Sequence, residues 1–384
     1  MATSVLALVL VGSNFLAYGT TERVARRWGA DDRTAAGTVA VQAQWVAFFI
    51  GAVTVPLLLA FAPQLCGLLG ADDGVLDVAV LYLRISAVGV PFVIVGLAAQ
   101  GALRGVSDYR SPLIVAVAAN VVNVVVELAF VFGADLGVAG AAWSTVIAQV
   151  LAGLALWWRS RSLARRAADR RPRWREIRPL LEAGRHLLLR VTAMLVVFTG
   201  ATSLAARVDE PTLAAHQIAI TVFLFLALTL DALAVPSQTL VAEELGRDDL
   251  PAATDVADRA LRMSLLLGGG LAVVLATLTP LIARGFTADP AVIDRAQIAL
   301  WFLAVVLLPA SAAFATDGSL IGAADYRFLG RAALGYLLLV VPIAAAVLTA
   351  DLGIAGIWTG LLVWMIARAV VNRRRSNHVL GRAG

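Results

Sequence analysis

The sequence predicts an all-α polytopic membrane protein. Of its 384 residues, 60% are hydrophobic and only 15% are charged, with a mean hydropathy of +0.85. In a soluble domain about a quarter of the residues are charged. Apolar runs of roughly 20 residues, the length that a helix needs to cross a bilayer, recur along the whole chain. The short alternating segments of a membrane barrel are absent, so we expect helical spans.

Eleven apolar runs account for these spans. The first lacks the basic start of a signal peptide, and we therefore interpret it as a true span. Pro91 and Pro236 fall inside spans, where proline bends a helix and frees backbone carbonyls. In order, the expected spans cover about residues 2–22, 38–64, 78–102, 113–133, 138–158, 185–206, 213–243, 259–283, 292–321, 329–349 and 353–372.

A strongly basic stretch interrupts the apolar pattern after the fifth span. We therefore expect an N-terminal bundle of five spans at residues 1–158 and a basic linker at 159–184. A C-terminal bundle of six spans with a basic tail follows at 185–384.

The two bundles are copies of one unit. Residues 105–110 (GVSDYR) recur as 322–327 (GAADYR), and residues 134–140 (ADLGVAG) recur as 350–356 (ADLGIAG), in one register to within one residue. Such a repeat predicts two six-helix bundles related by a pseudo-two-fold axis along the membrane normal. The span at 185–206 has no partner in the first half, so we expect the full repeat to include one helix before Met1.

The arginines indicate the orientation. The chain has no lysine, so all 31 basic residues are arginines. Most lie on every second connection between spans, which is one side of the membrane, and in the tail from Arg368. Only Arg207, Arg284 and Arg295 lie on the connections of the other side. This asymmetry predicts a cytoplasmic linker and C-terminus in the cell membrane. We interpret the basic linker as a topology determinant that touches membrane lipid, and we expect no nucleic-acid partner.

The sequence offers no motif for a cofactor or for enzymatic chemistry. It has one cysteine and three scattered histidines, and neither a metal-binding motif nor a phosphate-binding P-loop occurs. We expect neither an enzyme nor an ATP-driven pump, and no cofactor or metal beyond a coupling ion.

Several motifs together resemble the MATE (multidrug and toxic compound extrusion) family, and some resemble its DinF-like branch in particular. The resemblance covers essentially the whole chain and implies twelve helices arranged as six plus six. The family motifs are residues 104–112, 119–127 and 137–142, and those of the branch are 82–85, 214–219 and 317–325.

Glu127 is the leading functional candidate, because an ionisable group inside a span is costly and marks a pathway or a partner. Asn123 lies one turn earlier on the same helical face. The resemblance implies a cation or proton site formed by such an Asn and acid together with a Thr on the next helix, where this chain has Thr145. The family more often has Asp at the position of Glu127. The alternative is a glutamate near the outer headgroups.

Four further polar residues occupy equivalent positions in the two halves: Asp231 matches Asn14, and Asp317 matches Gln100. They are candidates for a cavity lining or a secondary proton site. A structural contact is the alternative for the first pair, and helix packing or gating is the alternative for Asp317.

The resemblance implies a monomeric secondary antiporter. It would export small organic compounds, often cationic or amphipathic, in exchange for H⁺ or Na⁺. Two alternatives remain open: a flippase for lipid-linked precursors from the same superfamily, and a truncated form that does not transport.

Overall fold

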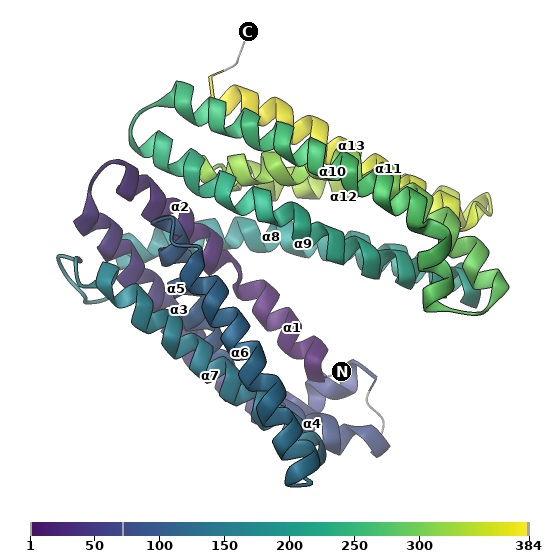
Figure 1. Cartoon of the computed structure of the whole chain (residues 1–384), viewed down its shortest axis with the longest axis horizontal. Coiled ribbons are helices and arrows are strands. Elements are labelled where there is room, and N and C mark those ends of the chain that lie inside the picture. Colours follow the sequence, from purple (N-terminus) through teal and green to yellow (C-terminus); the bar gives the residue numbers. More distant parts are fainter. Residues whose placement is uncertain (1, 71–72, 382–384) are drawn as a thin grey trace. The chain divides into compact units, whose positions relative to one another are not determined.

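The computed structural model describes residues 2–70 and 73–381, and every regular element within them is a helix (Figure 1). Ten of the described helices are long and apolar enough to cross a membrane, and a bent helix pair makes up to eleven. These helices cover all the spans expected from hydropathy. The prediction of a helical, multi-span membrane protein is confirmed.

The chain divides into two compact units, Met1–Gly184 and Arg185–Gly384. In the first unit the elements are α1 (Ala2–Ser13), α2 (Phe15–Gly29), α3 (Arg33–Leu68), α4 (Asp73–Ala87), α5 (Val90–Gly105), α6 (Arg110–Leu128), the π-helical turn η1 (Ala129–Gly133) and α7 (Gly137–Ala164). Helix α8 (Trp174–Val208) begins in the first unit and continues into the second. There it is followed by α9 (Glu210–Gly246), α10 (Leu250–Phe286), α11 (Pro290–Gly322), α12 (Tyr326–Thr349) and α13 (Gly353–Val379).

The stretch expected as a linker at 159–184 is mostly helical. Helix α7 continues to Ala164 and α8 begins at Trp174, so only residues 165–173 connect them without regular structure. Two spans of the first unit are interrupted, in contrast. Asn14 separates α1 from α2, and α4 and α5 meet at a bend of 46°.

The turns of the two units have the same backbone conformation. Three pairs of repeat-related residues other than glycine adopt a positive φ, a region that costs an L-residue roughly 1–2 kcal/mol. The pairs are Asp31 and Asp248 (57° and 59°), Ser107 and Ala324 (62° and 61°), and Asp135 and Asp351 (54° and 49°). The repeat seen in the sequence is therefore a repeat of local structure.

Repeat-related glycines allow close helix contacts in both units. A Cβ atom on Gly101 of α5 would lie 2.6 Å from the carbonyl oxygen of Ala17 in α2. The equivalent Cβ on Gly318 of α11 would lie 2.4 Å from the carbonyl oxygen of Ala234 in α9. Real Cβ atoms do not approach an oxygen this closely, so both positions need glycine for the backbones to meet.

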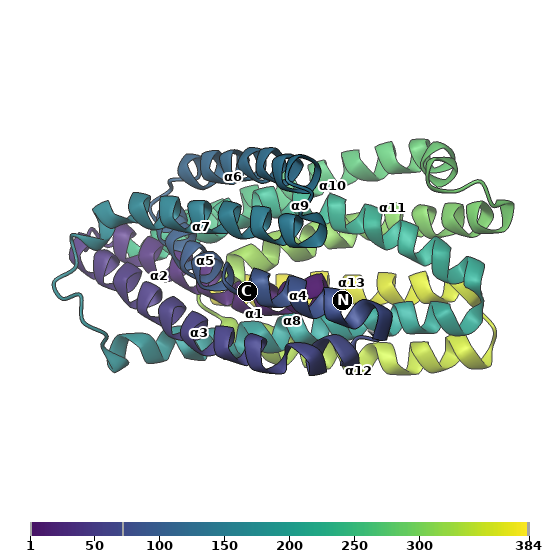
Figure 2. The ribbon, with the colours of Figure 1, turned by 90° about the horizontal axis from the view of Figure 1, so that it is seen from below.

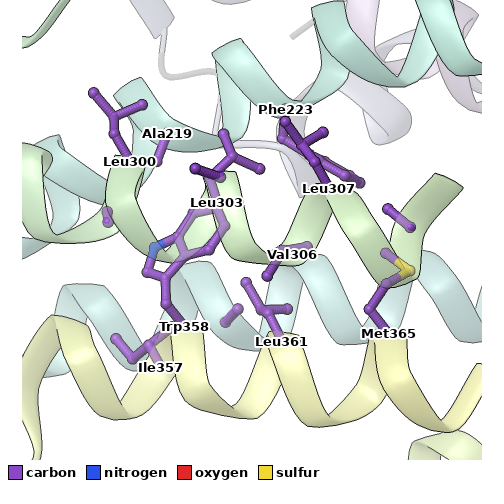
Figure 3. Close-up of a cluster of buried hydrophobic side chains, with 14 of the residues drawn as sticks. Ala219, Phe223, Leu300, Leu303, Val306, Leu307, Ile357, Trp358, Leu361 and Met365 are labelled. Atoms are coloured by element: carbon purple, nitrogen blue, oxygen red, sulfur yellow. The ribbon is translucent and has the colours of Figure 1, made fainter. Parts of the chain in front are cut away.

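The second unit has an extensive apolar core between α9, α11 and α13. Figure 3 shows Trp358 and Leu361 of α13 pointing toward Leu303 and Leu307 of α11, with Phe223 of α9 above them. All of these side chains are buried. Such packing fixes α11 and α13, which carry the Asp317 cluster described below.

Candidate functional site

The first unit has a cavity of about 340 Å³ between α5, α6 and α7. Its wall includes Asn123 of α6, Thr145 of α7 and Gln100 of α5. In Figure 1 these three helices run side by side, and Figure 2 shows them again from below. Two predicted cation ligands and one predicted cavity residue thus line the same space.

Glu127 does not line this cavity. The cavity wall on α6 ends at Asn123, and Glu127 lies about one turn further along, at about 6 Å of helix rise. Its side chain is half-buried. Because the Cα–Cβ bonds of an α-helix tilt toward its N-terminus, the Glu127 side chain leans toward the turn of Asn123.

The oxygen atoms around the cavity are only partly engaged. The Thr145 hydroxyl donates to the Ala141 carbonyl at 3.0 Å, which leaves its oxygen lone pairs available. Among the described residues, the side chains of Asn123 and Glu127 have no hydrogen-bond or ion-pair partner. Carboxylate, amide and hydroxyl oxygens are ligands suited to a hard cation such as Na⁺, or to a proton on the carboxylate.

Gln149 is a cavity residue that the sequence analysis missed. It lines the same wall one turn after Thr145, and its buried Oε1 accepts no hydrogen bond within the described part of the chain. Its four-residue spacing from Thr145, which places both residues on one face of α7, is the signal that could have identified it. Its unpaired oxygen adds a further acceptor to the cavity.

Asp317 lies in a buried polar cluster of the second unit. Its carboxylate accepts hydrogen bonds from Arg190 of α8, from Arg368 of α13 at 2.8 Å and from the Asn372 amide at 2.6 Å. The Tyr336 hydroxyl in turn donates to the Asn372 side-chain oxygen at 2.8 Å. The space among these groups is about 10 Å³, less than a water molecule needs with any margin.

This arrangement favours a structural role for Asp317. Two guanidinium groups and one amide occupy its oxygens, so the carboxylate is held in place as part of a buried network. Arg368, counted from the sequence with the basic tail, is instead buried, at 3% exposed. The four-residue spacing of Arg368 and Asn372 on α13 was the available signal.

Asn14 and Asp231 occupy different local structures despite their matching positions. Asn14 is the residue at which α1 gives way to α2, and it is half-buried. Asp231 lies in the middle of the continuous helix α9, also half-buried, and it engages a partner.

A second cavity, of about 310 Å³, lies in the second unit between α8, α12 and α13. Its wall is apolar apart from Ser203 and Arg207, and it contains Ala344, the repeat equivalent of Glu127. No carboxylate lines it. The position that holds Glu127 in the first unit is therefore occupied in the second by an alanine in an apolar cavity wall.

Comparison with known proteins identifies relatives along most of the chain. The MatE family profile matches residues 1–129 and 187–346. Protein DETOXIFICATION 44, chloroplastic, of Arabidopsis thaliana is 35% identical over 77% of this chain and 56% of that protein. DNA damage-inducible protein F of Escherichia coli (strain K12) is 30% identical over 68% of this chain and 58% of that protein. The chain thus spans less than two thirds of the length of either relative.

The fold also matches solved structures. One, an outward-facing conformation of a multidrug resistance MATE family transporter of the MOP superfamily, superposes with a TM-score of 0.90. The match covers 98% of this chain and 87% of that chain at 20% identity. With the duplicated helical units, these matches confirm the resemblance of the motifs, and the chain belongs to the MatE family.

Proposed function

We propose that the protein is a secondary active antiporter of the cell membrane that exports small organic compounds in exchange for H⁺ or Na⁺. The observation that carries the proposal is the half-buried Glu127, which lacks a partner among the described residues and lies one turn from a cavity lined by Asn123 and Thr145. Membership of the family and the names of the relatives support export.

The coupling follows from the charge of one group. An unpaired carboxylate at bilayer depth is unfavourable unless a proton or cation neutralises it. Binding of the coupling ion therefore stabilises states of the unit in which Glu127 is enclosed. Its release favours states in which the carboxylate meets water or a cationic substrate. A ligand shifts such an equilibrium only by its difference in affinity for the two states.

Asp317 is the less suitable coupling group. Arg190, Arg368 and Asn372 already satisfy its carboxylate, so a proton or Na⁺ would have to displace an arginine. We assign the Glu127, Asn123 and Thr145 group to ion coupling, with Gln149 as an added oxygen donor. Gln100, in the same cavity wall, contributes to the substrate or proton path, and Asn14 and Asp231 remain secondary candidates.

For substrate, we propose small cationic or amphipathic molecules, whose charge complements the acid and whose apolar parts fit apolar cavity walls. The protein would act as a monomer and without a cofactor, with the linker and the C-terminus in the cytoplasm. The side-specific distribution of arginines supports this orientation.

The test is transport of a fluorescent cation such as ethidium in proteoliposomes under an imposed pH or Na⁺ gradient. Glu127→Gln keeps the shape but cannot ionise, and gradient-driven transport should fall to the level of empty liposomes. Glu127→Asp should retain activity. The control is Asp77→Asn, which removes an exposed carboxylate from α4 of the same unit and should transport like the parent. Parent-like transport by Glu127→Gln would refute the assignment.

A further inference from the structure

A second hollow of the first unit lies where α3, α7 and the connection 165–173 meet. It has a volume of about 470 Å³. Its wall combines the aromatic side chains of Trp45, Phe48 and Trp157 with Arg161, Arg165 and Arg170. We call it the basic groove. Aromatic rings and arginines in one wall match a ligand that has both an apolar part and an anionic part.

The connection 165–173 is fastened against α3, which gives the basic groove a defined shape. The side chain of Gln42 is fully buried. Its amide nitrogen donates to the Arg171 carbonyl at 2.9 Å, and its oxygen accepts from the Arg173 backbone N–H at 2.8 Å. Trp45 Nε1 donates to the Arg170 carbonyl at 2.8 Å. Figure 2 shows this teal connection beside the start of α3.

Helix α7 is held to the same place. Gln44 of α3 donates to the Ser160 hydroxyl at 3.0 Å. One residue further on, the Arg161 guanidinium carbon lies 4.9 Å from the ring centroid of Trp157 and 5.0 Å from that of Trp158. Cation–π contacts of this kind orient an arginine while leaving its N–H groups free to bind.

The positive charge of the basic groove is not neutralised by the protein. Among the described residues, no carboxylate pairs with Arg161, Arg165 or Arg170. The nearby Asp169 is taken by Arg173, at 2.8 Å. Three unpaired arginines in one wall create a positive potential that selects an anion. The guanidinium fork fits two phosphate oxygens at once.

The surroundings of the basic groove indicate that this anion belongs to a lipid. Trp157 and Phe48 are exposed, and below them α3 presents a row of exposed apolar side chains: Phe49 (50%), Val53 (61%) and Leu57 (51%). An exposed apolar row on a spanning helix is suited to acyl chains. Tryptophan rings are enriched at the headgroup level, which is where a phosphate would meet the arginines.

We propose that the basic groove binds the phosphate headgroup of one anionic phospholipid, from the leaflet on the side of the linker, with its acyl chains along α3. Three arginines disfavour the trimethylammonium group of phosphatidylcholine, so the site is selective for an anionic headgroup such as phosphatidylglycerol. A free phosphate would leave the aromatic wall uncovered. This inference is independent of the transported substrate and of the coupling ion.

The experiment is native mass spectrometry of the purified protein titrated with dioleoyl phosphatidylglycerol or dioleoyl phosphatidylcholine. The parent should bind one phosphatidylglycerol before any other lipid. The variant Arg161→Gln/Arg165→Gln/Arg170→Gln should lose this step, with an apparent Kd raised about tenfold or more. The matched control Arg175→Gln/Arg327→Gln/Arg374→Gln removes the same charge from exposed arginines outside the groove and should bind like the parent.

Gln42→Leu separates the shape of the groove from its charge. This variant keeps every arginine but releases the connection, so its preference for phosphatidylglycerol should fall severalfold. Equal binding of the two lipids by the parent would overturn the proposal. So would parent-like binding by the groove variant, an equal loss in the control variant, or unchanged binding by Gln42→Leu.

Discussion

Arg375 donates a hydrogen bond from Nε to the Asp325 carboxylate at 2.6 Å. In the repeat-related pair of the first unit, Arg159 Nη2 lies 3.6 Å from Asp108 Oδ2. In each unit the arginine comes from the end of the last spanning helix, and the aspartate precedes the helix before it. The pair joins α12 to α13 in one unit and α6 to α7 in the other, so this end of both bundles is closed by the same contact.

The first prediction concerns the pH dependence of this contact. Asp108 also accepts hydrogen bonds from the Ser111 backbone N–H at 3.0 Å and hydroxyl at 2.6 Å. Burial alone would raise the pKa of Asp108, but these bonds and the Arg159 charge lower it overall. A lowered folded-state pKa gives stability that is present above the ordinary pKa of about 4 and is lost as the pH falls through the folded pKa.

We therefore expect Asp108→Asn to lower the free energy of unfolding by about 1 kcal/mol at pH 7, and the difference from the parent to be smaller at about pH 3, since it declines as the pH falls below the ordinary pKa. Thermal unfolding in detergent at the two pH values measures it. The control is Asp31→Asn, since the Asp31 side chain is 84% exposed in its pair with Arg33. An undiminished difference for Asp108→Asn at the lower pH would contradict the ion-pair explanation.

The second prediction tests the close contact of α9 and α11. Gly318→Ala places a methyl group against the Ala234 carbonyl and should destabilise the second unit by about 1–3 kcal/mol. Gly335→Ala in α12 meets nothing within 4 Å and should be neutral or slightly stabilising. The melting temperatures of the two variants measure the difference. Equal values would contradict the prediction, because they would show that α9 and α11 can move apart without a loss of stability.

The third prediction concerns the buried network. Asp317→Asn removes the negative charge that both Arg190 and Arg368 contact and should cost about 3–5 kcal/mol, as for other broken buried ion pairs. Tyr336→Phe removes a single hydrogen bond, to Asn372, and should cost about 1 kcal/mol. Unfolding in denaturant ranks the variants. Tyr336→Phe would be the more destabilising of the two only if the charges contribute nothing.

The fourth prediction contrasts two buried polar side chains. Both ring nitrogens of His216 are buried without a hydrogen-bond partner in the described structure, and the ring packs 5.9 Å from Trp358. His216→Leu should therefore be neutral or stabilising, because it removes an unsatisfied group. Gln42→Leu breaks two hydrogen bonds to the connection and should destabilise by about 2 kcal/mol. The same unfolding assay compares them, and a large loss for His216→Leu would indicate an unseen partner such as water.

The helical, duplicated fold was accessible from the sequence because its determinants are local. Hydropathy alone defines the spans, and the Asp- and Gly-containing turns specify backbone conformations that both units share. The break at Asn14 was not predicted, whereas the bend between α4 and α5 lies beside Pro91, where a proline bend was expected. The equivalent helices α9 and α11 are continuous, so composition does not distinguish a broken span from an intact one.

The polar sites were only partly predictable, because they depend on how helices distant in sequence are rotated and set in depth. Spacing put Asn123 and Thr145 on faces that meet at one cavity, but it did not indicate that the wall ends one turn before Glu127. The partners of Asp317 come from α8 and α13. The four-residue spacing of Arg368 and Asn372 puts both on one face of α13, but it does not say which way that face points.

The shared positive-φ turns mean that equivalent connections of the two units join their helices with the same local geometry. Residues 30–33 and 247–250 adopt the same backbone path, and Asp32 and Asp249 cap the following helix in the same way, at 2.8 and 2.9 Å. We therefore expect that a loop segment moved from one half to the other would meet the same backbone conformation at its ends. Chimeric chains built in this way would allow the surface of one half to be redesigned while the interior of both stays native.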